Sequence, residues 1–332
     1  MSVFGALMTF AARLAYLSLP VYLLRLAADR NPLTQYYFRL VLYVSTLSVC
    51  SICGAIISII MTLIGRRYDI NYVTARMFYN VASVVMGIKC TVEGEEHLAK
   101  GPYVMMGNHQ SMLDIIVLGR IFPRRASIMV KKELQFAPFL GQYVYLSGAV
   151  FVDRKNNKDA VAALAAAGAE VRRKNVSLWI FPEGTRHISK ESDLLPFKKG
   201  GFHLAVRAGV PIIPVICQNY WSIYHKGVLT DGNLKIKVLK PIPTAHLTIE
   251  DIPNLVTQTR EAMIAALREI SDGEPIAASG TTKVMEMRSQ VQEEVKSSVV
   301  PPSPVTGTGS FTEGSITGTE TSEDDGVLVD KP

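Results

Sequence analysis

Charged residues are scarce in this chain of 332 residues, at 19%, whereas hydrophobic residues make up 48%. This balance is too apolar for an ordinary soluble enzyme and too charged for a transporter with many membrane spans. The sequence also shows no internal repeat and no clear signal-peptide cleavage pattern. The composition therefore predicts a catalytic or binding domain combined with a limited membrane-embedded part.

Several catalytic and metal-binding motifs are missing as well. The four cysteines include one redox-like pair, Cys50-x-x-Cys53, but this pair lies midway along an apolar run and has no partner pair. The histidines other than His109 are scattered without metal-ligand spacing, so no metal is expected. The Gly-x-Ser-x-Gly and P-loop patterns are absent too. A covalent acyl-enzyme on a serine or cysteine is therefore not expected.

The apolar run from Leu40 to Ile64 contains twenty-five residues without a charge. At about 1.5 Å per residue, a helix of this length can cross a hydrocarbon core about 30 Å thick. Residues 1–28 are also apolar, but Arg13 and Arg25 leave only eleven uncharged residues between them, which suits an interfacial or re-entrant helix. Three arginines flank the long run on each side, so both a crossing helix and a hairpin that dips into one leaflet remain open.

Positive charge is concentrated outside the last part of the chain. Residues 291–332 carry a net charge of −6, which leaves +12 for the remainder. A basic body suits an anionic membrane surface and anionic substrates. Nucleic acid would also suit it, but no recognition motif supports that partner, and none is expected. Residues 276–332 are acidic and rich in Ser, Thr and Pro, so they are predicted to be disordered, either as a regulatory tail or as a dispensable linker.

Strand-like and helix-like segments alternate from about residue 84. The alternation predicts an α/β fold with a mostly parallel central sheet flanked by helices, preceded by an N-terminal membrane-embedded helical segment. The expected domains are residues 1–80 for the membrane-associated and transmembrane helices, 81–275 for the α/β domain and 276–332 for the tail. Strands are expected at residues 84–94, 103–107, 127–131, 149–154, 176–181, 211–217 and 234–239, and helices at 112–122, 137–146, 158–173, 200–208 and 249–270.

The segment GNHQSMLD, residues 107–114, combines a candidate base with a candidate orienting carboxylate. His109 follows a strand-like run, and Asp114 comes five residues later. Positions five apart lie roughly 140° apart on a regular helix, so the two side chains can meet only if His109 lies in the turn and Asp114 in the first helical turn. Asp114 would then hold one ring nitrogen and leave the other free to take a proton from a hydroxyl. The alternative is a capping box, with Ser111 as the N-cap of the next helix and His109 as an ordinary loop residue.

A second polar turn, Pro182 to Arg186, directly follows the strand-like run VSLWIF. Gly184 lets the backbone turn tightly, and Thr185 offers a hydroxyl and a backbone N–H group. The planar guanidinium of Arg186 matches the oxygens of a phosphate group. The pattern predicts an oxyanion cradle, although an ordinary turn with a solvated arginine has the same local sequence.

Together, GNHQSMLD and FPEGTR resemble motifs of the glycerolipid acyltransferase family, and specifically of the fungal-type 1-acylglycerol-3-phosphate acyltransferases. Two further blocks occur in the order of that family, SGAVFVDR at residues 147–154 and VPIIPV at residues 210–215. The segments KKEL at 131–134 and LPFKKGGFHLA at 195–205 are similar too. The resemblance covers roughly residues 40–270. Four blocks in order are far more specific than any one of them.

The resemblance implies that His109 is the general base and Asp114 its orienting partner. Since a carboxylate repels phosphate, Glu183 is better suited to holding Arg186 or a backbone N–H group, or to accepting from a substrate hydroxyl. The block at residues 210–215 would form part of the acyl or acceptor wall. The residues with an implied role in binding the glycerophosphate are Glu183, Gly184, Thr185 and Arg186, helped by Arg154 and Lys131.

The reaction implied by the resemblance is acyl transfer from acyl-CoA to the sn-2 hydroxyl of 1-acyl-sn-glycerol 3-phosphate (lysophosphatidic acid). The product would be phosphatidic acid for phospholipid and triacylglycerol biosynthesis, with acyl-CoA as a co-substrate and no cofactor. Three alternatives stay open: another acceptor such as lysophosphatidylinositol, a membrane-bound thioesterase, and a non-catalytic membrane scaffold. The expected location is the endoplasmic reticulum membrane with the catalytic domain facing the cytosol, or a lipid droplet.

Overall fold

The computed structural model describes residues 8, 25–26, 30–98, 101–138, 140–152, 168–169 and 171–272. All of these belong to one unit of the chain, Met1–Thr282. Four sequence-based expectations lie outside the described part: the N-terminal interfacial helix, Arg154, most of the helix expected at 158–173, and the tail. The backbone of Lys131 is described, but its side chain is not.

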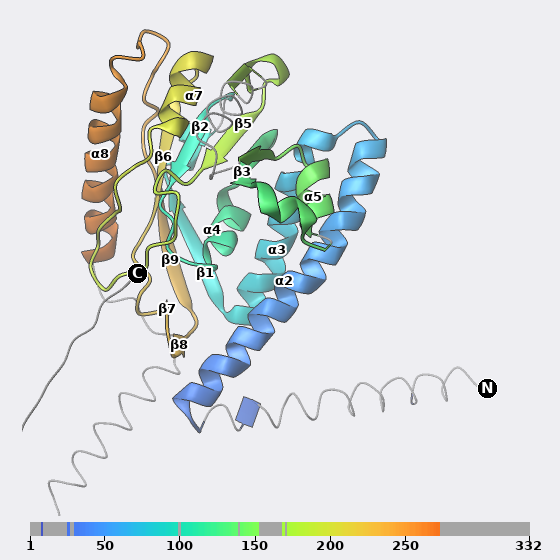
Figure 1. The fold of residues 1–332 in the computed structure, drawn as a ribbon. Helices are drawn as coiled ribbons and strands as arrows, with labels where there is room; N and C mark the ends of the chain where they lie inside the picture. Colours follow the sequence, from blue (N-terminus) through green and yellow to red (C-terminus); the bar gives the residue numbers. More distant parts are fainter. Residues whose placement is uncertain are drawn as a thin grey trace, which may run out of the picture. The chain divides into compact units, whose positions relative to one another are not determined.

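A seven-stranded sheet in the order β1-β9-β6-β2-β5-β3-β4 forms the centre of this unit (Figure 1). The five strands from β6 to β4 run parallel, whereas β9 pairs antiparallel with β6 and parallel with β1. The predicted mostly parallel α/β fold is therefore confirmed. The strands are β1 (Ile88–Glu93), β2 (Val104–Gly107), β3 (Ala126–Lys131), β4 (Val150–Val152), β5 (Ser177–Ile180), β6 (Ile212–Cys217) and β9 (Gly232–Val238), with a separate hairpin of β7 (Tyr224–His225) and β8 (Val228–Leu229).

Helices cover both faces of the sheet: α7 and α8 lie on one face, and α2, α3 and α4 lie on the other (Figure 1). Each face has its own hydrophobic core, because side chains alternate along a strand. On β2, Met105 belongs to one core, while Val104 and Met106 belong to the other. The helices are α2 (Pro32–Leu63), α3 (Ile70–Met86), α4 (Asp114–Ile121), α5 (Leu140–Leu146), α7 (Gly200–Ala208) and α8 (Ile252–Asp272), with the 3-10 turns η1 (Arg67–Asp69), η2 (Glu95–Leu98) and η3 (Lys132–Phe136).

Helix α3 was not expected from the sequence, and the strand expected at 84–94 begins too early. Residues 84–86 are the end of α3, and Gly87 terminates it in the left-handed conformation at φ 65°. β1 starts only at Ile88. Val84 and Val85 are β-branched and resemble a strand in the sequence, yet on the last turn of α3 both are exposed. Gly87 therefore marked the boundary between α3 and β1 more reliably than the β-branched valines before it.

Helix α2 begins with a capped turn, in which the Asn31 side chain accepts a hydrogen bond from Leu33 N at 2.9 Å. Among the helices of the described residues, α2 alone is long and apolar enough to cross a membrane. The mean hydropathy of its most apolar 18-residue stretch is 2.2. Only 17% of that stretch is buried. Large apolar side chains, including Val41 and Ile56, are exposed on it. The stripe that faces the rest of the unit is instead mostly small or polar and consists of Tyr43, Thr46, Cys50, Gly54 and Ser58.

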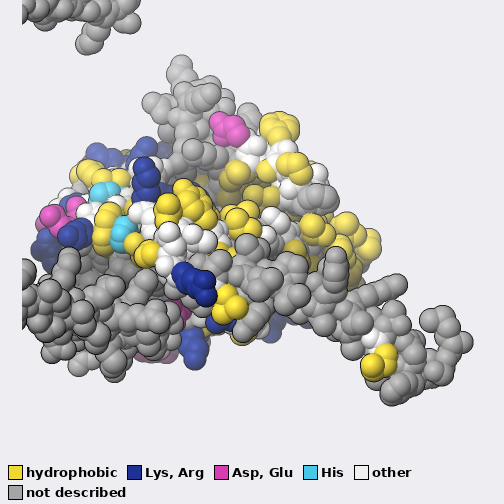
Figure 2. Space-filling model, turned by 90° about the horizontal axis from the view of Figure 1, so that it is seen from below, with side chains coloured by type: hydrophobic (Ala, Val, Ile, Leu, Met, Phe, Trp, Pro, Cys, Tyr) yellow, Lys and Arg dark blue, Asp and Glu magenta, His cyan; other side chains and the backbone are white. Residues whose placement is uncertain are grey.

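The same helix contacts the rest of the unit at more than one point. The Tyr43 hydroxyl donates to the Met112 carbonyl at 2.6 Å, just before α4. A Cβ atom on Gly54 would lie 2.8 Å from the Thr74 methyl group, so α2 and α3 approach closely there. Hydrophobic side chains gather toward the right of Figure 2, on the side that α2 and α5 occupy in Figure 1. The apolar helix and the sheet domain thus form one packed body.

Candidate active site

The two sequence motifs meet at the carboxyl edge of the parallel strands. His109 comes two residues after β2, and Glu183 comes three residues after β5. These strands pair in parallel, with Met106 opposite Ile180, so both motifs leave the sheet at the same edge. Lys131, the last residue of β3, ends at this edge as well. Open α/β sheets bind ligands at such an edge.

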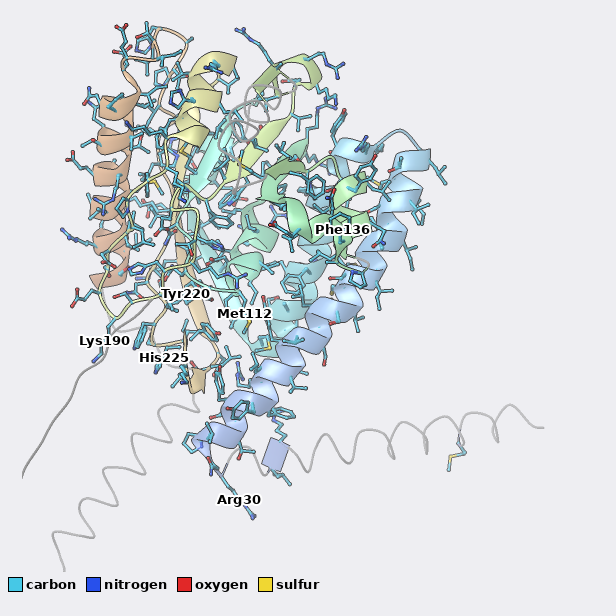
Figure 3. All side chains as sticks on the ribbon, in the orientation of Figure 1. Arg30, Met112, Phe136, Lys190, Tyr220 and His225 are labelled. Atoms are coloured by element: carbon cyan, nitrogen blue, oxygen red, sulfur yellow. The ribbon has the colours of Figure 1, made fainter. Side chains whose placement is uncertain are left out.

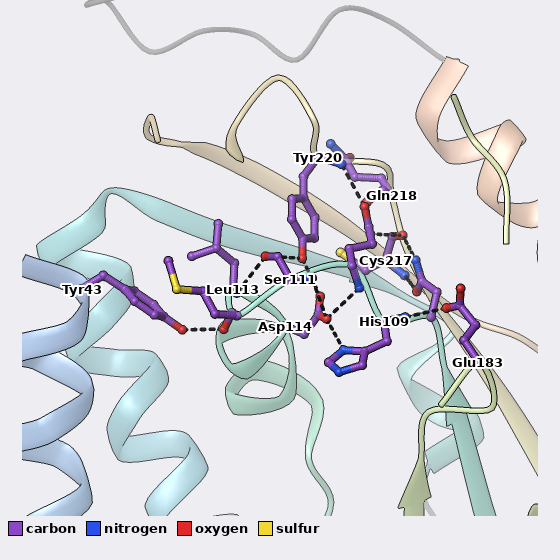
Figure 4. Close-up of polar contacts among 12 residues, drawn as sticks. Tyr43, His109, Ser111, Leu113, Asp114, Glu183, Cys217, Gln218 and Tyr220 are labelled. Atoms are coloured by element: carbon purple, nitrogen blue, oxygen red, sulfur yellow. Dashed lines mark hydrogen bonds and ion pairs between the residues drawn. The ribbon is translucent and has the colours of Figure 1, made fainter. Parts of the chain in front are cut away.

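The expected contact between His109 and Asp114 is present, with Nδ1 2.7 Å from Asp114 Oδ2 (Figure 4). Asp114 is the first residue of α4 and His109 lies in the preceding turn, as the spacing required. An ionised carboxylate only accepts hydrogen bonds, so Nδ1 carries the proton and Nε2 of the neutral ring is the basic nitrogen. Nε2 makes no hydrogen bond to the described residues, and the imidazole stacks on Phe181 at 3.9 Å. The ring is fixed in plane and its basic atom is available.

The capping-box alternative is also realised, in part, by the same carboxylate. Asp114 Oδ2 accepts from Ser111 N at 3.1 Å and from Gln110 N at 2.8 Å. The Ser111 hydroxyl accepts from Leu113 N at 3.0 Å. The N-cap residue is Leu113, however, and not Ser111 as the sequence suggested. One aspartate therefore closes the turn before α4 and orients the imidazole.

Tyr220 is a component of the site that the sequence motifs did not reveal. Its hydroxyl donates to Asp114 Oδ1 at 2.6 Å and lies 2.9 Å from the Ser111 hydroxyl. Burial and the neighbouring Asp114 carboxylate raise the pKa of Tyr220 well above its ordinary value. In Figure 3, Tyr220 and Met112 lie at the same end of the sheet. Its position in the sequence could have indicated a role in the site, because Tyr220 comes three residues after the fully buried strand β6.

Two amides on either side of His109 join its turn to the end of β6. Asn108 donates to the Cys217 carbonyl at 2.8 Å and accepts from Cys217 N at 2.9 Å, so its side chain replaces a strand-to-strand hydrogen-bond pair. Gln110 donates to the Gln218 carbonyl at 2.9 Å. These contacts hold the backbone of the motif on both sides of the base.

Both carboxylate oxygens of Glu183 accept hydrogen bonds from backbone N–H groups. Its Oε1 accepts from His109 N at 2.8 Å and its Oε2 accepts from Leu195 N at 3.0 Å. The side chain is only 3% exposed, and burial raises the pKa of Glu183 although the two backbone hydrogen bonds oppose that rise. Glu183 therefore joins the two motifs by holding backbone N–H groups, which is one of the roles expected for a carboxylate here.

The remainder of the FPEGTR turn faces solvent. Gly184 has φ 71°, a conformation that favours glycine, and a Cβ there would meet the Lys198 side chain at 2.8 Å. Thr185 and Arg186 are exposed. In the described ranges Arg186 has no hydrogen-bond or ion-pair partner, although its charge opposes the burial-induced rise in the pKa of Tyr224 on β7. A guanidinium in this state is available to an anionic ligand.

The block at residues 210–215, expected to form part of the acyl or acceptor wall, is mainly a strand of the sheet core, although Val215 lines a small cavity together with Asn108 and Asp114. Residues 212–217 are the central strand β6, and all six are buried. Ile213 and Val215 point into one core, and Ile212 and Ile216 point into the other. Because β6 has a neighbouring strand on each side and helices over both faces, its apolar run reflects burial in the sheet.

Comparison with known proteins identifies related sequences and folds. The acyltransferase family model matches residues 89–218. The 1-acyl-sn-glycerol-3-phosphate acyltransferase of Saccharomyces cerevisiae is 43% identical over 71% of this chain and 78% of its own length. The alpha form from Homo sapiens is 34% identical over 73% of this chain and 84% of its own length.

Solved structures with a similar fold include that of a bacterial acyltransferase. The crystal structure of the 1-acyl-sn-glycerophosphate (LPA) acyltransferase of Thermotoga maritima matches with a TM-score of 0.59 and 23% identity. The match covers 72% of this chain and 98% of that protein. With its paired histidine and aspartate at the carboxyl edge of the sheet, the chain belongs to the acyltransferase family.

Proposed function

We propose that the protein transfers an acyl group from acyl-CoA to the sn-2 hydroxyl of 1-acyl-sn-glycerol 3-phosphate and so forms phosphatidic acid. The observation that carries the proposal is the 2.7 Å contact from His109 Nδ1 to Asp114 Oδ2, which leaves Nε2 basic. The names of the related yeast and human proteins support this acceptor. The donor is proposed from the chemistry, because a thioester carbonyl reacts with an activated hydroxyl without a covalent enzyme intermediate.

In the proposed mechanism, His109 Nε2 removes the proton of the sn-2 hydroxyl as its oxygen attacks the thioester carbonyl. Asp114 stabilises the imidazolium that results. The tetrahedral intermediate then collapses, the C–S bond breaks, and the imidazolium returns its proton to the leaving thiolate of CoA. General-base catalysis of this kind contributes roughly 10²–10⁴-fold.

Arg186 is proposed to bind the phosphate of the acceptor. Its guanidinium group is exposed at the end of the FPEGTR turn and has no hydrogen-bond or ion-pair partner among the described residues. Gly184 and Thr185 would present backbone and hydroxyl groups beside it. Lys131, the last residue of β3, is retained as a proposed helper, as is Arg154, which lies outside the described residues. Binding the phosphate away from the reacting hydroxyl would position that hydroxyl near His109.

The assay uses full-length purified protein, lysophosphatidic acid and labelled acyl-CoA. We expect His109→Ala to lose at least 99% of turnover, in line with the loss of a general base. The control is His246→Ala, which changes an exposed histidine outside the site and should retain full turnover. Retention of more than a tenth of turnover by His109→Ala would contradict the mechanism. Release of free fatty acid at an equal rate without acceptor would indicate a thioesterase instead.

The acceptor is tested separately with Arg186. Arg186→Ala should raise KM for lysophosphatidic acid by about tenfold or more and change KM for acyl-CoA little. Arg186→Lys should restore binding only partly, because an ammonium group lacks the planar fork. An effect confined to acyl-CoA would mean that this turn holds the phosphates of CoA. A panel of lysophospholipids, including lysophosphatidylinositol, then defines the acceptor range.

We further propose that the protein lies in the cytosolic leaflet of the endoplasmic reticulum, where acyl-CoA is available. Helix α2 is packed against α3 and against the turn before α4, so lipid cannot surround it on all sides. Its exposed apolar face would contact the bilayer while the opposite face stays on the domain. This arrangement favours a helix embedded in one leaflet over one that crosses the membrane alone.

A further inference from the structure

A cavity lies at the opposite edge of the sheet from His109. Its volume is about 400 Å³, within the range of small-ligand sites. The residues around it precede the parallel strands: Tyr103 precedes β2, Arg125 precedes β3, and Asn175 lies just before β5. Because His109 follows β2, the length of the sheet separates this cavity from the proposed reaction.

The described lining of the cavity carries an excess of positive charge. Three arginines contribute to it, Arg76, Arg124 and Arg125, against one acid, Glu95. Glu95 is already matched, because Arg120 donates to both of its carboxylate oxygens at 2.8 Å. Arg76 Nη2 also lies 4.0 Å from Glu95 Oε1, so Arg76 shares this acid with Arg120. The lining therefore keeps a net positive charge, carried by Arg124 and Arg125, for a ligand.

Two of the lining residues adopt a backbone conformation that is uncommon for them. Arg125 and Asn175 both have φ 50°, in the left-handed region. They are linked, because Arg125 Nε donates to the Asn175 carbonyl at 3.2 Å. Such strain is concentrated at binding and catalytic sites in many proteins. Here it shapes the rim from which an arginine is presented.

Two arginines of the cavity lining have their guanidinium groups over tyrosine rings. Arg124 lies 4.6 Å from the centre of the Tyr72 ring, and Arg125 lies 5.6 Å from that of Tyr68. Tyr68 lies in the η1 turn that connects α2 to α3, and Tyr72 lies in the first turn of α3. Arginines and tyrosines beside the end of an apolar helix are typical of the membrane–water interface, where phosphate headgroups lie.

We propose that the cavity formed by Arg76, Arg124 and Arg125 binds the phosphate group of an anionic ligand at a site separate from the catalytic edge. One planar guanidinium group can donate two parallel hydrogen bonds to two oxygens of a phosphate. Three guanidinium groups around one cavity therefore favour a phosphate, which has more oxygens than a carboxylate. The ligand is either a phospholipid headgroup or a soluble phosphate compound. Arg124 is the best residue to change, because it is exposed and its recorded contact is with Tyr72.

The test measures phosphate binding in the Arg186→Ala protein, which removes the proposed catalytic phosphate contact. Inorganic phosphate is titrated into the detergent-solubilised full chain at constant ionic strength, and Tm is recorded. Arg124→Gln in this background should weaken phosphate binding by about tenfold or more. The control is Arg268→Gln, which removes an exposed arginine from α8. The proposal would be overturned if these two double variants bound inorganic phosphate equally and the two arginine variants also bound anionic lipid vesicles equally in the experiment below.

A second arm identifies the source of the phosphate. Binding is measured to phosphatidylcholine vesicles with and without phosphatidylglycerol, an anionic lipid that is neither proposed substrate nor product. Weaker binding of the Arg124→Gln protein to the anionic vesicles only, relative to Arg268→Gln, assigns the site to a lipid headgroup. Unchanged vesicle binding together with weaker binding of inorganic phosphate assigns it to a soluble phosphate compound.

Discussion

At the scale of single residues, the site is organised around the carboxylate of Asp114. Its two oxygens accept from the His109 ring, from the backbone N–H groups of Gln110 and Ser111, and from the Tyr220 hydroxyl. Four donors leave the carboxylate little freedom to rotate. The imidazole is thus positioned by a group that is itself held in place, which general-base catalysis requires.

Tyr220→Phe tests whether this positioning affects turnover. The change leaves Asp114 Oδ1 without its 2.6 Å donor, so we expect kcat to fall by about tenfold while both KM values change less than twofold. The control is Tyr103→Phe, which removes a comparable bond to the Leu98 carbonyl at 2.7 Å, at the far end of β2. If both variants lose the same turnover, the effect of Tyr220 is on general stability alone.

Glu183 predicts a specific dependence of stability on pH. Burial raises its pKa in the folded state above the ordinary value of 4.5, so the folded protein holds the proton more tightly than the unfolded chain. The contribution of this group is fully present below pH 4.5 and is lost as the pH rises through the raised pKa. The Tm of wild type minus the Tm of Glu183→Gln should therefore fall as the pH rises from about 4.5. Thermal unfolding of the full chain across this range measures both values, and a rise of this quantity with pH would contradict the assignment.

At the scale of elements, short apolar strands alternate with helices, and polar turns at the strand ends carry the function. β2 ends at Gly107, where a Cβ atom would lie 2.3 Å from the Trp179 ring, so only glycine fits beside β5. The chain then turns directly into α4. The buried strands supply the rigid support on which the His109 turn is held.

The packing of α2 on α3 depends on Gly54. A Cβ there would lie 2.8 Å from the Thr74 methyl group, so Gly54→Ala should overpack the contact and lower stability by about 1–3 kcal/mol. Thr74→Ala removes that methyl group and should restore most of the loss in the double variant. The measurement is thermal unfolding of the four proteins in detergent. Independent, additive effects of the two changes would show that the helices do not meet at this point.

At the scale of the whole molecule, the proposed membrane contact is made by the exposed face of α2. Ile56 on that face is 54% exposed, so Ile56→Glu would place a charge in lipid and should reduce membrane association severalfold. Ile249→Glu is the matched control, because Ile249 is 53% exposed and precedes α8 on the far face of the sheet. Flotation with liposomes measures both variants. Equal loss in the two would mean that α2 does not contact lipid through this face.

The sequence was sufficient for much of this architecture because its signals were local. Seven strand-like runs correspond to the seven strands of the main sheet, since each is a short apolar segment bounded by Gly, Pro or polar residues. His109 and Asp114 were paired correctly because their contact spans a single turn. Gly184 and Arg186 were placed at the carboxyl edge because a strand directly precedes them.

Tertiary structure alone decided the features that depend on distant segments. Tyr220 meets Asp114 across more than a hundred residues, and Glu183 receives its hydrogen bond from His109 through the parallel pairing of β2 with β5. The buried position of β6 and the arginine cavity at the opposite edge also depend on strand order. Strand order follows from how the apolar faces pack together, and no local pattern in a single sequence encodes it.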